Sequence, residues 1–165
     1  MISTRLKECL DNAGVAYARH AHTPAYTSQE IAQAVHVPGE VMVKSVILKA
    51  DEGPLVMAVL SANDTVNMDV LREEIGCDNL RLATENEFRD AFPTCKTGAM
   101  PPIGSLFDVP TYCEQTLSRD REIEFNGGSH DETIRMEFDD FMRLAKPRMA
   151  HFAGPYREHP QRMSA

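Results

Sequence analysis

Apolar residues along the chain recur with two different periods. Between Leu6 and Ala13 they follow helical spacing, and Gly14 comes directly after them, so the pattern predicts a helix that ends at Gly14. Two runs of branched apolar residues, 41–50 and 55–60, are separated by a short turn-forming segment. Such a pair of runs predicts a β-hairpin.

The starts of further helices are marked by capping residues. Thr27-x-x-Glu30 and Thr84-x-x-Glu87 both match the capping box, and Asn67 can cap another helix. The pattern also predicts short strands over 17–22, 80–83, 109–113, 121–125 and 133–137, and a closing helix over 138–145. Helices mixed with strands in this way indicate an α+β or mixed α/β domain.

Length and composition indicate a single folded domain. The 165 residues are 42% hydrophobic and 25% charged, which excludes collagen, coiled-coil and disordered chains. No stretch approaches the roughly 20 apolar residues of a membrane span, and the N-terminus lacks the apolar segment of a signal peptide. We therefore expect a cytoplasmic protein without a membrane partner, whose four scattered cysteines are reduced thiols.

The charge is distributed unevenly along the chain. The formal net charge is −8, which excludes indiscriminate nucleic-acid binding through a basic surface. Residues 146–165 nevertheless carry four basic side chains against Glu158 alone, a net of +3. We expect a domain over residues 1–145 followed by a basic C-terminal tail over 146–165, which is either a solvated segment or a weak phosphate-contacting arm.

One charged residue interrupts an apolar strand. Lys44 lies within VMVKSVILK, a run otherwise suited to a strand that is buried on both faces. Lysine is rarely buried without a partner, so two interpretations stay open. Lys44 lies either at a sheet edge with its ammonium in water, or in a pocket where the ammonium holds an anionic or carbonyl oxygen.

Two glycine-rich segments are candidate walls of such a pocket. Segment 98–104, GAMPPIG, combines glycines that let a ligand approach the backbone with prolines that stiffen the path. Backbone N–H groups in such a loop can bind an oxyanion or a phosphate. The turn 126–130, NGGSH, is either a plain hairpin turn or a rigid one that presents Ser129 and His130 to a ligand.

Two other kinds of site are weaker interpretations. His20 and His22 lie two residues apart, on one face of the predicted strand, but a structural zinc site needs four ligands and no CxxC pair is present. A serine hydrolase is disfavoured because the adjacent Ser129, His130 and Asp131 cannot converge as a triad, and there is no GxSxG motif. We expect no metal and no cofactor.

The strand lysine, the glycine–proline loop and the late glycine turn, in this order, resemble the YbaK/prolyl-tRNA synthetase-associated domain family. The resemblance extends from about Ser3 to Ala145 and includes the capped helix in HAHTPAYTSQEIAQA. It implies a single compact YbaK-like domain, in which helices flank a mixed, mostly antiparallel sheet of six or seven strands. Members are freestanding deacylases or editing domains of prolyl-tRNA synthetases, so the implied partners are an aminoacylated tRNA acceptor end and a synthetase.

The resemblance also implies roles for individual residues. Lys44 matches the family's essential lysine, which positions the substrate and stabilises developing charge, and Gly98 and Gly104 bound the loop that surrounds the reacting carbonyl. The residues implied to line the substrate pocket are Ser45, Ala99, Met100, Pro102, Gly127, Gly128, Ser129 and His130. Catalysis would come from positioning a water or the terminal ribose hydroxyl beside preorganised donors, with no covalent nucleophile.

The implied reaction is hydrolysis, in trans, of the ester that links a wrong amino acid to tRNA. Ala99 stands where many members carry a second glycine, and Ser45 follows the lysine where the alanine-editing branch has asparagine, although His130 matches that branch. The expected substrate is a small residue on tRNA(Pro): alanine, cysteine or serine. The alternative is a non-catalytic module that binds a small ligand or a regulatory partner, which Ala99 and the acidic charge favour.

Overall fold

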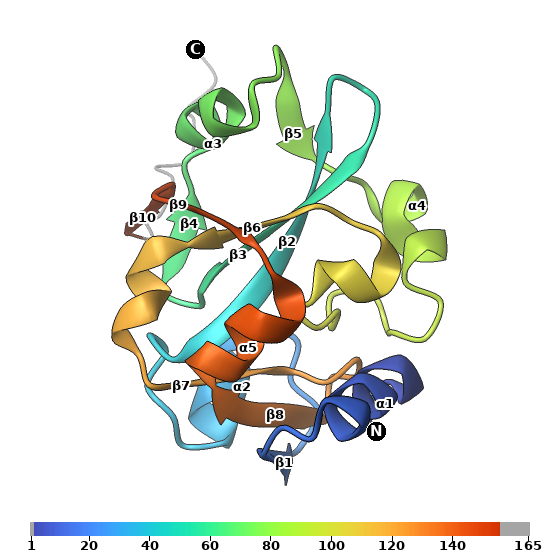
Figure 1. Cartoon of the computed structure of the whole chain (residues 1–165), viewed down its shortest axis with the longest axis vertical. Helices are drawn as coiled ribbons and strands as arrows, with labels where there is room; N and C mark the ends of the chain where they lie inside the picture. Colours follow the sequence, from blue (N-terminus) through green and yellow to red (C-terminus); the bar gives the residue numbers. More distant parts are fainter. Residues whose placement is uncertain (1, 156–165) are drawn as a thin grey trace, which may run out of the picture.

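The computed structural model describes residues 2–155 (Figure 1). The α-helices are α1 (Thr4–Ala13), α2 (Ser28–Ala34), α3 (Met68–Ile75), α4 (Glu85–Phe88) and α5 (Phe138–Ala145), and the 3-10 helices are η1 (Arg89–Ala91), η2 (Gly104–Phe107) and η3 (Gln115–Arg119). The strands are β1 (Tyr17–Ala21), β2 (Met42–Ala50), β3 (Leu55–Ser61), β4 (Asp64–Val66), β5 (Leu80–Leu82), β6 (Thr111–Glu114), β7 (Glu122–Asn126), β8 (Glu132–Glu137), β9 (Arg148–Ala150) and β10 (Ala153–Pro155). Within this part of the chain, every helix is too short or too polar to cross a membrane.

Eight strands form one mixed sheet in the order β1-β8-β7-β2-β3-β6-β9, with β5 added beside β2. β4 and β10 form a separate antiparallel pair. The pairs β2–β7, β3–β6 and β6–β9 are parallel, and the other pairs of the large sheet are antiparallel. The predicted fold class, a mixed and mostly antiparallel sheet flanked by helices, is confirmed.

The helix boundaries follow from the capping residues that predicted them. Thr27 Oγ1 accepts a hydrogen bond from Glu30 N at 3.1 Å, and Asn67 Oδ1 accepts one from Val70 N at 3.3 Å. α1 ends at Gly14, whose φ of 67° is a left-handed conformation that glycine adopts without strain. These signals act within one turn of the helix end, so they can be recognised in the sequence.

The chain remains folded beyond the boundary expected at residue 145. β9 extends the sheet beside β6, and β10 pairs with β4, so residues 148–155 belong to the domain. Glu114 is fully buried and accepts hydrogen bonds from Phe152 N at 2.7 Å and Ala153 N at 2.8 Å. The rest of the expected basic tail, residues 156–165, lies outside the described residues.

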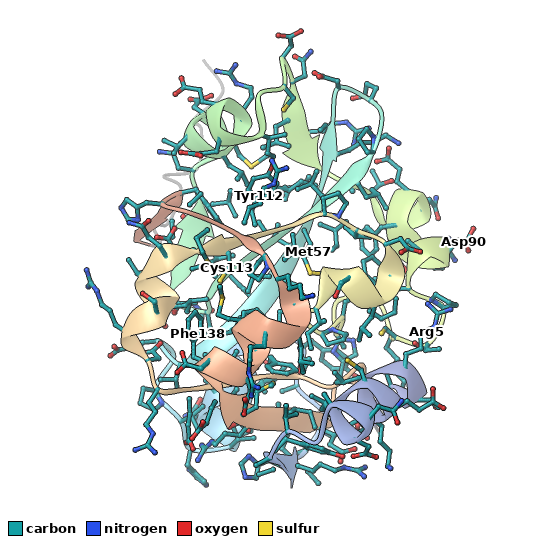
Figure 2. All side chains as sticks on the ribbon, viewed as in Figure 1. Arg5, Met57, Asp90, Tyr112, Cys113 and Phe138 are labelled. Carbon is teal, nitrogen blue, oxygen red and sulfur yellow. The ribbon has the colours of Figure 1, made fainter. Side chains whose placement is uncertain are left out.

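The two faces of the large sheet are packed differently. One face carries a single continuous apolar cluster to which α1 and α5 contribute, and Figure 2 labels Met57, Cys113 and Phe138 within it. The other face carries two separate clusters, one against α3 that includes Tyr112 and one against α2 that includes Met42. β2 contributes to both clusters, so its residues between them lie at a break in the apolar covering.

The hydrogen-bond ladder along β2 is interrupted at the same place. β3 occupies one edge of β2 from Val43 to Lys49. On the other edge, β7 pairs only with Met42 and Val43, and β5 pairs only with residues 48–50. Within the described chain, residues 44–47 therefore have no strand beside them on that edge.

Candidate active site

Lys44 occupies the break in the apolar face. Val43 and Ile47 enter the continuous cluster, and because side chains alternate along a strand, Lys44 points to the opposite face. Its side chain is partly buried, and this burial lowers the pKa of the ammonium below its usual value. The negative charge of Asp64 only partly offsets that effect, and it acts without a hydrogen bond to the ammonium.

Lys49, in the same strand, has a different environment. Its ammonium forms an ion pair with Glu87 at 3.1 Å, and Glu87 is also held by Arg81 at 2.8 Å. Lys44 has no such ion pair within residues 2–155. A partly buried ammonium without a paired carboxylate is available to an anionic or carbonyl oxygen of a ligand.

The glycine–proline loop is fastened to β2 beside the gap in the ladder. Ser45 Oγ donates a hydrogen bond to Met100 O at 3.1 Å, on the face of β2 opposite to Lys44. Gly98 has φ 83°, which favours glycine, whereas Ala99 and Met100 are buried. The structure thus brings the loop into direct contact with Ser45, and the neighbouring lysine points to the other side.

The far end of the loop packs into the domain. Pro102 and Gly104 are both buried. A Cβ at Gly104 would overlap Thr111 Oγ1 and Val109 O, and Gly104 O accepts a hydrogen bond from Val109 N at 3.0 Å. These contacts give Gly104 a packing role, while the catalytic role implied by the resemblance stays a prediction.

His130 joins the late glycine turn to the loop. Its Nε2 lies 2.8 Å from Thr97 O, and since a carbonyl only accepts, Nε2 carries the proton in this contact. The Cβ position at Gly98 lies 3.5 Å from His130 Cε1, so the imidazole contacts the loop there. Lys96 N also donates to Gly128 O at 2.9 Å. The loop and the turn are therefore bonded to each other through residues 96–97.

The N-terminal residues fix the glycine turn, which the sequence did not reveal. Ser3 N donates to Gly127 O at 2.6 Å, and Ser3 Oγ lies 2.9 Å from Thr94 Oγ1. A Cβ at Gly127 would lie 2.6 Å from Ile2 Cγ2, and one at Gly128 would lie 2.9 Å from Ser3 Cβ. Both glycines are therefore required by close packing against residues 2–3, independently of any ligand.

Ser129 contributes to the internal bonding of the turn. It is buried, and its hydroxyl donates to Asp131 Oδ1 at 2.6 Å. This hydrogen bond is the main reason why the pKa of the Asp131 carboxyl is lowered to about 2. The hydroxyl therefore stabilises the turn, and its contact with a substrate stays a prediction.

Three buried side-chain atoms near the turn have no hydrogen-bond partner among the described residues: His22 Nε2, Asn126 Oδ1 and His130 Nδ1. Asn126 follows Phe125, the partner of Val43, so by strand alternation its side chain lies on the same face of the sheet as Lys44. His22 N donates to Asp131 O at 2.9 Å, next to His130. An unpaired buried polar atom costs roughly 1–3 kcal/mol, so each of these atoms is a position where a bound group would relieve that cost.

The three unpaired atoms share one chemical character. His22 Nδ1 lies 2.7 Å from Thr23 O, and His130 Nε2 lies against Thr97 O, so in each neutral ring the remaining nitrogen carries a lone pair. The side-chain oxygen of Asn126 is also an acceptor. Each of the three atoms therefore suits a hydrogen-bond donor such as an ammonium or a hydroxyl group.

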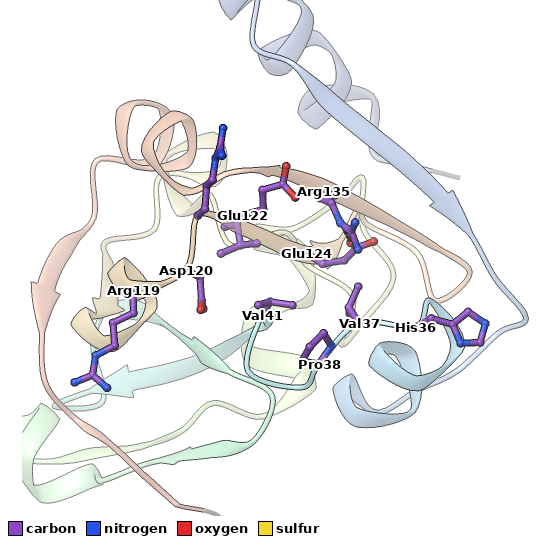
Figure 3. A pocket seen from close by; sticks show the side chains of 11 residues that line it. His36, Val37, Pro38, Val41, Arg119, Asp120, Glu122, Glu124 and Arg135 are labelled. Carbon is purple, nitrogen blue, oxygen red and sulfur yellow. Dashed lines mark hydrogen bonds and ion pairs between the residues drawn. The ribbon is translucent and has the colours of Figure 1, made fainter.

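A second polar cluster borders a cavity of about 670 Å³ near the start of β7 (Figure 3). Fully buried Glu124 accepts hydrogen bonds from His20 Nδ1, from Thr133 Oγ1 at 2.6 Å and from Arg135 Nε at 2.8 Å. His20 therefore bonds a carboxylate, whereas His22 bonds a backbone carbonyl. No group of three metal-ligating side chains occurs between residues 2 and 155, and the cavity is lined by none of the predicted site residues.

Comparison with known proteins decides the family. A model of the aminoacyl-tRNA editing domain matches residues 22–144. The chain belongs to the aminoacyl-tRNA editing domain family. The matched residues include the strand that carries Lys44, the glycine–proline loop and the turn that carries His130.

Named relatives of this editing domain are partial matches. The multifunctional Ser/Thr-tRNA deacylase ProXp-y of Escherichia coli (strain K12) is 30% identical over 98 residues, which cover 59% of this chain and 58% of the relative. The proline–tRNA ligase of Heliobacterium modesticaldum is 31% identical over 88 residues, which cover 53% of this chain and 15% of the ligase. The chain therefore spans less than two thirds of the length of either relative.

A solved structure extends the likeness to the whole fold. The crystal structure of a putative trans-editing enzyme for prolyl tRNA synthetase matches 91% of this chain and 95% of its own, with a TM-score of 0.77 and 23% identity. The architecture of the editing domain is thus shared over nearly the full length of both chains.

Proposed function

We propose that this editing domain is an aminoacyl-tRNA deacylase that acts in trans on a mischarged tRNA. The observation that carries the proposal is that Lys44, whose ammonium has no ion pair within residues 2–155, lies on the same face of the sheet as the unpaired acceptor of Asn126. An aminoacyl ester offers matching groups, because its carbonyl oxygen suits the ammonium and its α-ammonium suits the acceptor. Membership of the editing family supports the same reaction.

In the proposed reaction, a water oxygen bonds to the acyl carbon, and the bond from that carbon to the ribose oxygen breaks. The ribose oxygen takes up the proton that the water releases, so the products are a free amino acid and an uncharged tRNA. The Lys44 ammonium would stabilise the negative charge that develops on the carbonyl oxygen. Removing a single preorganised donor of this kind lowers the rate by roughly 100- to 1,000-fold.

We propose a small amino acid on tRNA(Pro), namely alanine, cysteine or serine, as the substrate. A site that forms a hydrogen bond to a hydroxyl can discriminate strongly, whereas an apolar pocket separates near-isosteres poorly. Asn126 Oδ1 and His130 Nδ1 are available for such a bond, which favours serine. The Ser/Thr-tRNA deacylase among the relatives supports the same preference.

The test is a deacylation assay on tRNA(Pro) charged separately with alanine, cysteine, serine, threonine or proline. We expect the wild-type protein to hydrolyse seryl-tRNA(Pro) fastest and to spare prolyl-tRNA(Pro). Lys44→Ala should lose roughly 100- to 1,000-fold in rate. Lys49→Ala, the matched control from the same strand, should keep the wild-type rate although it removes the ion pair with Glu87.

Two outcomes of this assay would contradict the proposal. A wild-type rate in Lys44→Ala would place the chemistry at other residues. Hydrolysis of none of the five species, with prolyl-tRNA synthetase present, would favour the non-catalytic binding module.

We propose a synthetase as a further partner that holds the body of the tRNA. The net charge of −8 limits the phosphate contacts that the domain can make by itself. In a gel-shift assay at physiological salt, we expect the isolated protein to bind tRNA(Pro) weakly and the synthetase to increase that binding. Tight binding by the isolated protein would contradict this division of roles.

A further inference from the structure

Tyr26 lies beside His130 and is 73% exposed. The two ring centroids are 4.9 Å apart, and the ring planes are inclined by 48°. Single exposed apolar residues are common on proteins, so exposure alone assigns no role to Tyr26. The contact with His130 places Tyr26 next to the candidate site, because His130 contacts Thr97 and Gly98 and carries one of the unpaired acceptors.

The backbone that carries Tyr26 is held in place. Ala25 N donates to His130 O at 3.1 Å, and His22 N donates to Asp131 O at 2.9 Å, so this segment is bonded to the glycine turn at two points. The capped start of α2 follows directly after Tyr26. The ring is thus presented from a fixed backbone and has few torsions left to order, so little conformational entropy would be lost when a ligand stacks on it.

The charge of the domain favours contact with bases over contact with phosphates. Basic side chains normally supply much of the affinity for nucleic acids, and this chain has a net charge of −8. A single-stranded RNA end can instead be held by stacking its bases on aromatic side chains. In an aminoacyl-tRNA, the terminal adenine is attached to the same ribose that carries the ester, so it lies close to any bound acyl group.

We propose that Tyr26, supported by His130, is a stacking platform for the terminal adenine of the tRNA acceptor end. The proposal rests on the proposed deacylase function, and it adds recognition of the RNA to the recognition of the acyl group proposed above. Stacking on a ring face tolerates any base, which suits a domain that has to distinguish acyl groups rather than RNA sequences.

The test uses an uncharged acceptor-stem RNA hairpin with 2-aminopurine in place of its 3′-terminal adenine. Stacking quenches 2-aminopurine fluorescence, so binding and stacking are measured without any hydrolysis. We expect quenching with the wild-type protein and with Tyr26→Phe, which keeps the ring. Tyr26→Ala should abolish the quenching and weaken binding by about 5- to 150-fold, the equivalent of about 1–3 kcal/mol for one stacked base.

The control is Leu82→Ala, which removes another exposed apolar side chain and should leave both signals unchanged. Thermal melting of each variant shows that the fold is retained. Wild-type quenching and affinity in Tyr26→Ala, or no quenching by the wild-type protein, would overturn the platform. Failure of the proposed deacylase function would give a different result. The charged tRNAs would then stay intact, while the uncharged hairpin would still bind and its 2-aminopurine fluorescence would still be quenched.

Discussion

The two faces of the central sheet are built for different tasks. On one face, a single cluster joins α1, α5 and the inward residues of β2, β3, β7 and β8 without interruption. On the other, the clusters against α2 and α3 are separate, and Lys44 lies on β2 between them. The comparison teaches that the domain leaves part of its second face uncovered by apolar side chains, and that Lys44 lies in this uncovered part.

Two lysines of β2 show the same difference within one strand. Lys49 is neutralised by Glu87 in a network that also contains Arg81. Within residues 2–155, Lys44 has the charge of Asp64 nearby but no hydrogen bond to it, and burial lowers the pKa of its ammonium. A partly buried ammonium without an ion pair lowers the free energy of unfolding, and destabilising groups of this kind are common at functional sites.

The largest effect that we predict concerns the continuous face. Phe141 is fully buried there, and Phe141→Ala should lower the free energy of unfolding by about 3–5 kcal/mol through lost burial and a cavity. Denaturant unfolding followed by circular dichroism measures this change, with Leu82→Ala as an exposed control expected within about 0.5 kcal/mol of wild type. A loss below about 1 kcal/mol would show that this face does not dominate stability.

A smaller effect connects the first residues of the chain to the site. Gly127→Ala should cost about 1–3 kcal/mol, because its Cβ would lie 2.6 Å from Ile2 Cγ2. The rate of deacylation should also fall, since the turn carries His130. In a double-mutant cycle, Ile2→Ala should recover part of both losses. Strictly additive effects would contradict the packing account of this glycine.

Sequence reasoning succeeded where the signal is local. The caps at Thr27, Asn67 and Thr84 and the glycine after α1 set the helix boundaries from within one turn. It missed β4, β9 and β10, because these strands form only where distant parts of the chain pair, β10 with β4 and β9 with β6. Phe152 is buried in the apolar cluster against α3, and its backbone N–H donates to the carboxylate of Glu114, a residue of β6 far away in the sequence.

The candidate site, like the fold, could be predicted from the sequence only in part. Lys44 was visible because a charge in an apolar run is anomalous on its own. From the sequence, we considered His22 only as a metal ligand and Asn126 only as part of the turn, because which of their atoms stay unpaired depends on the groups that are bonded in the folded chain. The sequence also could not show that Gly127 and Gly128 accommodate residues 2–3, or that Lys44 and Ser45 point to opposite faces beside the loop.

The most direct test compares Lys44→Met with Lys49→Met in seryl-tRNA(Pro) deacylation and in unfolding. Because burial lowers the pKa of Lys44 in the folded state, the ammonium destabilises the fold at neutral pH, and this penalty disappears as the pH rises towards 10.5. We predict that Lys44→Met loses roughly 100- to 1,000-fold in rate while its stability at pH 7 equals or exceeds that of wild type. We expect Lys49→Met to keep its rate. A Lys44→Met protein that unfolds more easily yet still deacylates would contradict the account.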